Sequence, residues 1–365
     1  MFTLDQMLHR HALNRHFSRL HLSGFLFSSF VSLAAASFLK VSNTDADYVL
    51  EHLQFKDLGI MSHSLVLLGY GSSFMVSVFS TEESIAGLEK CVLKRTIPLA
   101  RKQNEAIFQN RINAMMLELR TLTHDPIRQH ENIVKFLGIT WETDPFDIER
   151  KWPVFLMERA MNGTLVDVFQ TERALALSTR LNLILDVILG LEILHSCGII
   201  HGDVKLENIL VFDSLDNSTV DRPFIAKLAD FGGSIFDVST TSRLSSGTQP
   251  WNAPEWRERL DPKALQLTDI YSLGFVMWRI LANGEHPFPV RAQFISQQAW
   301  QKEIENLKAT DEGMEKHLTQ VSTFETEVER RLVEATIKRT IKKDPADRSI
   351  AEVKHLVQAL VKNPR

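Results

Sequence analysis

The spacing of apolar residues first predicts a group of short β-strands. A turn that contains Gly69 and Gly71 separates two apolar, β-branched runs, which is typical of a β-hairpin. A further strand is expected over residues 89–97, and two more over residues 133–141 and 153–157. This part of the chain is therefore predicted to be mainly β-structure.

One helix is expected to interrupt these strands, between about residues 103 and 122. Its apolar positions follow the helical spacing of three and four: Ile112, Met115, Met116 and Leu119. Glu118 lies at the border of this apolar stripe, where a carboxylate can point inward.

The second half of the chain is predicted to be mainly helical. Apolar residues three and four positions apart between residues 181 and 188 mark a long buried helix that ends near Gly198. Short strands are expected at residues 209–212 and 225–228, with several helices after them. The pattern thus predicts an α+β protein, with a small β-rich half joined to a larger helical half at about residues 158–163.

Composition and charge place the chain among ordinary globular proteins. Of its 365 residues, 44% are hydrophobic and 24% are charged, and the net charge is −4. Nothing in that balance indicates nucleic-acid binding. Cys91 and Cys197 are the only cysteines of the chain, and they lie in no metal-binding spacing. So few cysteines disfavour a disulfide framework and favour a reducing compartment, so a cytoplasmic location is expected.

Residues 1–44 need a separate interpretation. Arginines precede an apolar stretch at residues 22–39, whose length is close to the ~20 residues that span a bilayer, although serines interrupt it. One interpretation is a helix or strand pair packed on the following domain. The other is a membrane anchor or targeting segment, with a secretory signal the least favoured form. Both interpretations stay open at this point.

Two charged residues in the β-rich half suggest a pair. Lys94 lies inside a predicted strand, where a lysine is usually solvated, whereas an inward lysine needs a partner because an unpaired buried charge is costly. Glu118, on the predicted helix that follows, can supply that partner.

A second group of polar residues lies in one predicted loop and the turn that follows it. Asp203, Lys205 and Asn208 recur within His201–Asn208, and Asp230 begins an Asp-Phe-Gly turn. A single loop aspartate is more often a turn former or a helix cap. Here the spacing lets one loop aim three polar side chains at a single point.

Taken in order, these motifs resemble those of the eukaryotic-type protein kinases, over roughly residues 58–360. The matching segments are the glycine-rich turn at 69–76, Val92-Leu93-Lys94, Glu118, the loop His201–Asn208, Asp230-Phe231-Gly232, Ala253-Pro254-Glu255, residues 269–274 and residues 344–348. The resemblance implies a bilobal protein kinase fold. Residues 45–160 would form the N-terminal lobe and residues 161–365 the C-terminal lobe, with residues 1–44 as a separate segment.

The resemblance also implies which residues carry the chemistry. Asp203 would accept the proton of a substrate hydroxyl, Lys205 would steady the transferred phosphate, and Lys94, paired with Glu118, would contact the phosphates of ATP. Asn208 and Asp230 would hold Mg²⁺ through oxygen ligands. The remaining nucleotide-binding residues would be Gly69, Gly71, Val76, Val92, Glu158, Ala160 and Leu210.

Structural roles and a substrate class follow from the same resemblance. Glu255 would pair with Arg348, and Asp269 would brace the catalytic loop. Lys205, together with a Thr248 hydroxyl that reaches it and Asp203, resembles the serine/threonine kinase pattern. The expected partners are therefore proteins with Ser or Thr acceptors. A tyrosine-kinase-like subgroup is a further interpretation, and the oligomeric state stays open.

Three positions depart from the family pattern. Phe74 replaces the third loop glycine, and Val92 replaces the usual small alanine above adenine. Gly202 stands where many kinases carry an arginine that receives an activation-segment phosphate. We therefore expect activity that does not depend on phosphate at Thr240, Thr241, Ser242, Ser245 or Ser246.

Two other functions remain alternatives. A pseudokinase would keep the fold and act as a scaffold, which the three departures favour. A small-molecule kinase, such as those that modify aminoglycosides or choline, shares the catalytic-loop pattern. Those families lack the Ala-Pro-Glu segment and the partners Asp269 and Arg348, which disfavours this alternative.

Overall fold

The computed structural model of this protein describes most of the chain after residue 64. The described residues are 65–71, 74–79, 90–97, 105–144, 147–172, 174–214, 222–236, 243–244, 247–288, 293, 295–322 and 324–362. The apolar segment at 22–39 and the five candidate phosphorylation sites lie outside them. Within the described part, no helix is both long and apolar enough to cross a membrane.

The chain divides into two compact units, which meet in sequence between Arg159 and Ala160. Residues 130–133 belong to the second unit although residues on both sides belong to the first. The reason lies in Asn132, whose side-chain amide donates to the Ala226 carbonyl (3.1 Å) and whose own carbonyl accepts from Leu228 N (2.9 Å).

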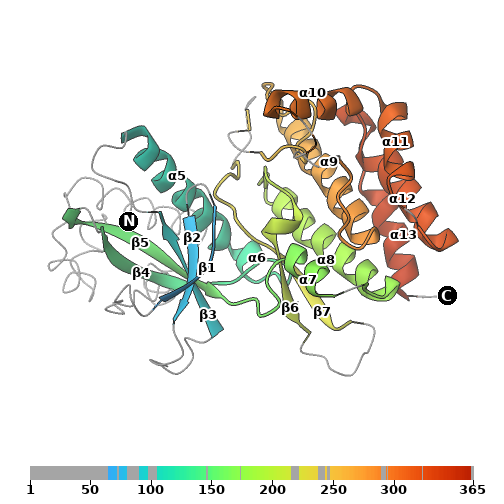
Figure 1. The fold of residues 1–365 in the computed structure, drawn as a ribbon. Helices are drawn as coiled ribbons and strands as arrows, with labels where there is room; N and C mark the ends of the chain where they lie inside the picture. The colour runs from blue at the N-terminus through green and yellow to red at the C-terminus, as the bar shows by residue number, and fades with distance from the viewer. Residues whose placement is uncertain are drawn as a thin grey trace. The chain divides into compact units, whose positions relative to one another are not determined.

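The first unit contains an antiparallel sheet of five strands in the order β1-β2-β3-β5-β4 (Figure 1). The strands are β1 (Leu65–Tyr70), β2 (Phe74–Phe79), β3 (Cys91–Thr96), β4 (Phe136–Asp144) and β5 (Asp147–Glu158). The expected strand at 133–141 begins three residues late, because Ile133 bridges instead to Leu228 in the second unit. The last expected strand is longer than its apolar run, because hairpin pairing with β4 carries it back to Asp147.

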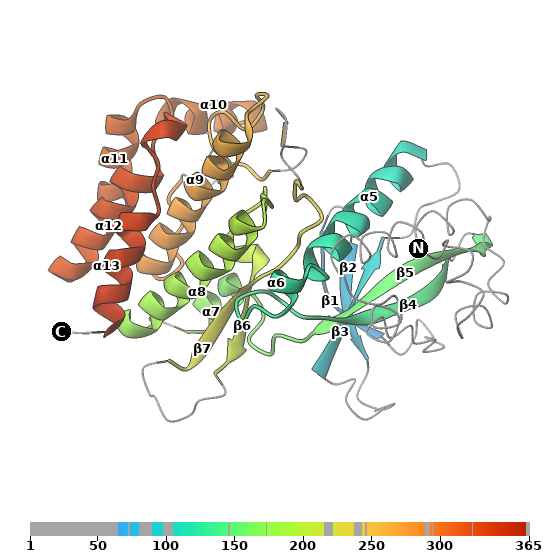
Figure 2. The same ribbon diagram turned by 180° about the vertical axis from the view of Figure 1, so that it is seen from behind.

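Helix α5 (Glu105–Leu122) lies along this sheet in both views, and the short α6 (Asp125–Arg128) follows it (Figures 1 and 2). The expected apolar stripe is confirmed at Met115, Met116 and Leu119, which are buried, whereas Ile112 is half-buried. Glu118, beside them, is fully buried as well. The sequence periodicity therefore gave both the helix and its inward face.

The second unit is mainly helical, as the pattern predicted. Its helices are α7 (Leu165–Thr171), α8 (Leu177–Ser196), α9 (Pro262–Leu281), α10 (Gln297–Leu307), α11 (Asp311–Gln320), α12 (Glu327–Thr340) and α13 (Ala351–Lys362). Figure 2 shows α8, α9, α12 and α13 packed side by side. A two-stranded hairpin of β6 (Ile209–Asp213) and β7 (Phe224–Leu228) packs on α8.

The end of α8 sets where the next loop starts. Gly198 has a positive φ of 69°, its N–H donates to the His195 carbonyl, and Ile199 N–H donates to the Leu194 carbonyl. These two bonds form the Schellman arrangement that closes a helix with a glycine. The chain therefore turns sharply from α8 into the loop that begins at His201.

Candidate active site

The loop at residues 201–208 is held in place by one buried carboxylate of α9. Asp269 accepts hydrogen bonds from His201 N (2.8 Å) and Gly202 N (2.9 Å). His195, at the end of α8, contacts the same carboxylate through Nε2 at 2.9 Å. The expected bracing role of Asp269 is thus present as a set of contacts that fix the loop backbone.

Asp203 lies at the centre of a compact polar group. Its carboxylate accepts from Lys205 Nζ (2.6 Å) and from the Thr248 hydroxyl (2.7 Å). Lys205 Nζ also donates to the Thr248 hydroxyl at 2.7 Å. The three residues therefore meet as the sequence predicted, and a lysine ammonium lies beside the carboxylate.

The next polar residue of this group is Asn208, at the end of a short 3₁₀ turn (Leu206–Asn208). Its side-chain nitrogen donates to the Asp203 carbonyl (2.8 Å) and carboxylate (3.1 Å). Because the nitrogen faces Asp203, the amide oxygen is directed elsewhere, as a ligand for a hard cation requires.

Asp230 has an unusual backbone conformation. Its φ is +63°, a region that non-glycine residues rarely adopt and that often marks functional sites. The preceding residue fixes this turn, because Ala229 N donates to the Asn208 carbonyl (2.9 Å) and the His201 ring contacts the Ala229 carbonyl (3.1 Å). Asp230 thus follows directly on the segment that is tied to Asn208.

The first unit carries its own polar pair. Lys94 Nζ contacts both carboxylate oxygens of Glu118, at 2.8 and 2.7 Å, and both side chains are buried. The predicted pairing of strand and helix is therefore present. The ring of Phe74 also lies 5.0 Å from Lys94 Nζ, a cation–π contact that the sequence did not reveal.

The remaining predicted nucleotide-binding residues lie in both units. In the first unit, Gly69 pairs with Val76 across β1 and β2, and Val92 pairs with Met157 across β3 and β5. Glu158 ends β5, where its carboxylate accepts from Lys135 N (2.7 Å). Gly71 follows β1, and its N–H donates to the Phe74 carbonyl. In the second unit, Ala160 accepts from Gly163 N and Leu210 is in β6.

The backbone conformation at Gly202 favours glycine, a feature separate from the absence of the arginine that many kinases carry at this position. Its φ is +79°, and its N–H is bound to Asp269. A side chain at this φ is strained by about 1–2 kcal/mol. Glycine therefore avoids backbone strain at the residue directly before Asp203.

We expect Gly202→Ala to lower the free energy of unfolding by about 1 kcal/mol, because alanine must adopt the left-handed region. Urea unfolding measures this. Gly69→Ala is the control, because Gly69 has no positive φ and a Cβ there would meet no atom within 4 Å. Equal stability of Gly202→Ala and Gly69→Ala would contradict the strain argument.

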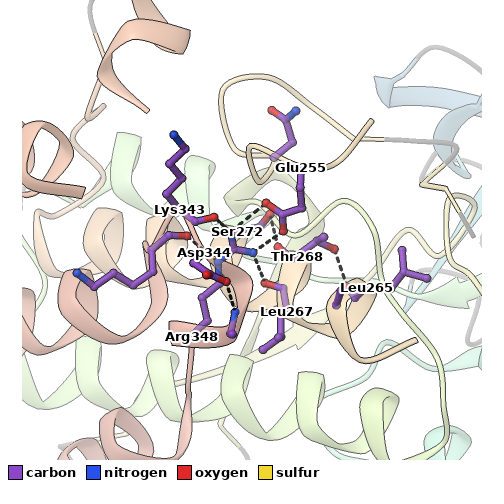
Figure 3. A network of polar contacts seen from close by, with 12 residues as sticks. Glu255, Leu265, Leu267, Thr268, Ser272, Lys343, Asp344 and Arg348 are labelled. Carbon is purple, nitrogen blue, oxygen red and sulfur yellow. Dashed lines mark hydrogen bonds and ion pairs between the residues drawn. The ribbon is translucent and has the colours of Figure 1, made fainter. Parts of the chain in front are cut away.

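A buried ion pair anchors the Ala-Pro-Glu segment (Figure 3). Arg348 donates to both oxygens of Glu255, at 2.5 and 2.9 Å, and its side chain is fully buried. The guanidinium also donates to the carbonyls of Leu267, Lys342 and Lys343. The predicted pairing is thus part of a network that joins three segments of the second unit.

A second cation near this segment, on a half-buried lysine, was not predicted from the sequence. Lys308 Nζ donates to the carbonyls of Pro250 (2.5 Å) and Asn252 (2.6 Å). It also lies 5.4 Å from the Tyr271 ring centroid. Desolvation lowers the pKa of Lys308 to about 7, although nearby Glu255 raises it in part.

This lowered pKa predicts a pH dependence of stability. Between pH about 7 and 10.5 the unfolded chain keeps the lysine proton that the folded chain has released. The unfolded state then binds more protons, so stability rises with pH over this window, by at most about 1.4 kcal/mol per pH unit. The unfolding free energy of wild type minus that of Lys308→Met is therefore expected to rise from pH 6 to pH 9. A flat difference would show that Lys308 keeps an ordinary pKa.

Comparison with known proteins places these features in one family. Residues 69–359 match the model of the protein kinase domain. The chain is 31% identical over 172 residues to receptor-interacting serine/threonine-protein kinase 1 of Homo sapiens, a match that covers 43% of this chain and 23% of the relative. It is 33% identical over 165 residues to receptor-interacting serine/threonine-protein kinase 3 of Rattus norvegicus, covering 43% and 32%. Against serine/threonine/tyrosine-protein kinase HT1 of Arabidopsis thaliana it is 32% identical over 174 residues, covering 45% and 39%. The matches span less than half the length of each of these relatives.

Proposed function

Because this chain belongs to the protein kinase domain family, we propose that it transfers the γ-phosphate of ATP to Ser or Thr hydroxyls of proteins. The observation that carries the proposal is the group formed by Asp203, Lys205 and Thr248, with contacts of 2.6–2.7 Å. A carboxylate beside an ammonium is suited to orient a hydroxyl and accept its proton.

Each residue of the second unit then has a separate task. Asp203 would receive the hydroxyl proton at its carboxylate as the phosphate is transferred. Lys205 would place its positive charge beside the oxygens that gain negative charge. Thr248 would keep both side chains at their observed spacing, because it bonds to each of them.

Asn208 and Asp230 would hold Mg²⁺. An amide oxygen and a carboxylate fit this ion, which prefers oxygen ligands and shares them with nucleotide phosphates. When bound, the ion neutralises phosphate charge. The chain's own contribution is to hold Asn208 against Asp203 and to set the backbone of Asp230 in its left-handed turn.

The first unit would supply the phosphate-binding cation. Lys94 is buried and paired with Glu118, so its ammonium is held in one place before nucleotide binds. The adenine would meet Val92 and the backbone of Glu158 and Ala160, as the family pattern implies.

A pseudokinase is the second candidate, and one contact favours it. The Phe74 ring lies 5.0 Å from Lys94 Nζ. The family pattern has a glycine at this position, which leaves the space beside the lysine open. A ring beside this ammonium competes with phosphates for the same face. We give priority to the enzyme because each residue proposed for catalysis is present with its partner.

The acceptor is tested by amino-acid analysis of the product. Full-length protein is incubated with γ-labelled ATP, Mg²⁺ and a mixed peptide library, and the labelled residues are identified after acid hydrolysis. Label on phosphoserine or phosphothreonine supports the proposal. Label only on phosphotyrosine, or only on small molecules, contradicts it.

Location belongs to the same proposal. We place the kinase domain in the cytoplasm, with residues 22–39 as a candidate membrane contact. Fractionation of the full chain and of a chain that lacks residues 1–44 tests this. Recovery of both in the soluble fraction would remove the membrane contact.

A further inference from the structure

An apolar cluster lies next to the catalytic loop, and a residue between the Asp-Phe-Gly and Ala-Pro-Glu motifs is part of it. Its buried members are Ile200, Leu244, Leu260 and Leu265, and Ile235, Trp256 and Ala264 pack against them. Leu244 is only 6% exposed. A leucine so well covered fixes the position of its own backbone.

The cluster joins segments that the proposed chemistry needs. Ile200 directly precedes His201, and Ile235 follows the Asp230 turn. These two residues exchange both backbone hydrogen bonds, at 3.0 Å each. Leu260 and Leu265 flank the start of α9, the helix that carries Asp269. Leu244 therefore packs on residues that lie on both sides of the catalytic loop.

Leu244 is also close in sequence to the hydroxyl that binds Asp203. Thr248 follows four residues later, after Gly247, whose φ of +150° favours glycine. A Cβ on Gly247 would lie 3.3 Å from the ring of Trp256, which itself packs on the cluster. Gly247, directly before Thr248, therefore lies close to this apolar surface.

The chemistry of the cluster matters because of Gly202. A phosphate on the activation segment would need a cation to receive it, and Gly202 supplies none. Every member of the cluster is apolar. Burial of the Leu244 side chain is favourable in itself, so this contact forms without a phosphate group.

We infer that Leu244 is a positioning residue, an apolar clasp that keeps Thr248 on Asp203 and Lys205 without activation-segment phosphorylation. This rests on the proposed function, and it assigns the regulation of that same site. The apolar contacts of Leu244 need no later modification of the chain.

Steady-state kinetics on the full chain test the clasp. Leu244→Ala is expected to lower kcat by about 10- to 100-fold while the KM for ATP stays unchanged, since truncating a buried leucine shifts an equilibrium by at least one power of ten. Leu244→Met, which keeps the volume, should restore most of kcat. Ile295→Ala, a truncation at a fully exposed apolar residue, is the matched control and should change nothing.

The same assay compares the clasp with phosphorylation. A chain with alanine at Thr240, Thr241, Ser242, Ser245 and Ser246 should keep kcat within about twofold of wild type. The inference is overturned if this variant loses as much kcat as Leu244→Ala, or if folded Leu244→Ala keeps the wild-type kcat. Should Leu244→Ala fail to fold, Leu244→Val gives the same comparison with a smaller truncation.

Hydrogen exchange separates the clasp from the proposed function. The backbone amides of residues 247–249, 251 and 252 should exchange faster in Leu244→Ala than in wild type or Ile295→Ala, whether or not the protein transfers phosphate. If the protein has no transferase activity, kcat cannot be measured, and hydrogen exchange is then the test of the clasp. Faster exchange supports the clasp, and unchanged exchange overturns it.

Discussion

Replacing Asp203 by Asn is expected to lower the rate of phosphoryl transfer by about 10²- to 10⁴-fold. The amide keeps the shape of the carboxylate, and its one oxygen can still accept from either Lys205 or Thr248, which now bind different oxygens of Asp203, but it cannot take the hydroxyl proton. The folded structure should therefore persist, and ATP affinity should change little, while kcat falls. Initial rates with labelled ATP, together with nucleotide titration, measure both quantities.

The matched control for this change is Asp213→Asn. Asp213 is an exposed carboxylate at the end of β6, and its partner is the side chain of Asn162. We expect the control to keep the wild-type rate. A rate for Asp203→Asn equal to that of the control would mean that the carboxylate of Asp203 is not the proton acceptor.

Replacing Arg348 by Met is expected to lower the free energy of unfolding by about 3–5 kcal/mol, because it leaves the Glu255 carboxylate buried without its ion-pair partner. The loss should be large because the carbonyls of Leu267, Lys342 and Lys343 also lose their donor (Figure 3). Urea unfolding followed by circular dichroism measures the change.

Two further variants identify the cause of that loss. Arg331→Met breaks an ion pair with Glu327 in which both side chains are well exposed, and it should change stability little. The double variant Glu255→Met/Arg348→Met removes both buried charges and should recover part of the lost stability. No recovery would show that the guanidinium's carbonyl contacts, rather than the unpaired carboxylate, account for the loss.

Local periodicity explains why much of the fold could be predicted. The inward face of α5 follows from the spacing of Met115, Met116 and Leu119, and the hairpin of β1 and β2 follows from its glycine turn. The exceptions arise from contacts distant in sequence. Ile133 is apolar and β-branched, yet it lies outside β4 because it forms a β-bridge to Leu228, which belongs to the same unit as Ile133 but is distant in sequence.

The candidate site shows the same division. Asp203, Lys205 and Thr248 could be placed together because their motifs occur in a known order. Lys308 could not, because its role depends on two carbonyls more than fifty residues away and on aromatic rings of α9. The sequence shows Phe74 only as a replacement for the third loop glycine, and the folded sheet brings its ring to Lys94.

Gly202 illustrates how structure changes an interpretation. From the sequence it was a missing cation, and its consequence was independence from phosphate. The structure shows a left-handed backbone at this residue. It also shows an apolar cluster beside the loop, of which Leu244 is a member. Gly202 therefore bears on two properties: the stability of the loop before the proposed base, and the proposed independence from phosphorylation.

We expect this chain to act as an enzyme and not as a scaffold. The most direct test is a single-turnover measurement of γ-phosphate transfer from ATP, with Mg²⁺, by full-length wild type beside Lys94→Met and Asp203→Asn. Transfer to Ser or Thr that is present in wild type and falls to background in both variants is the predicted result. Nucleotide binding by wild type without any transfer would contradict the claim.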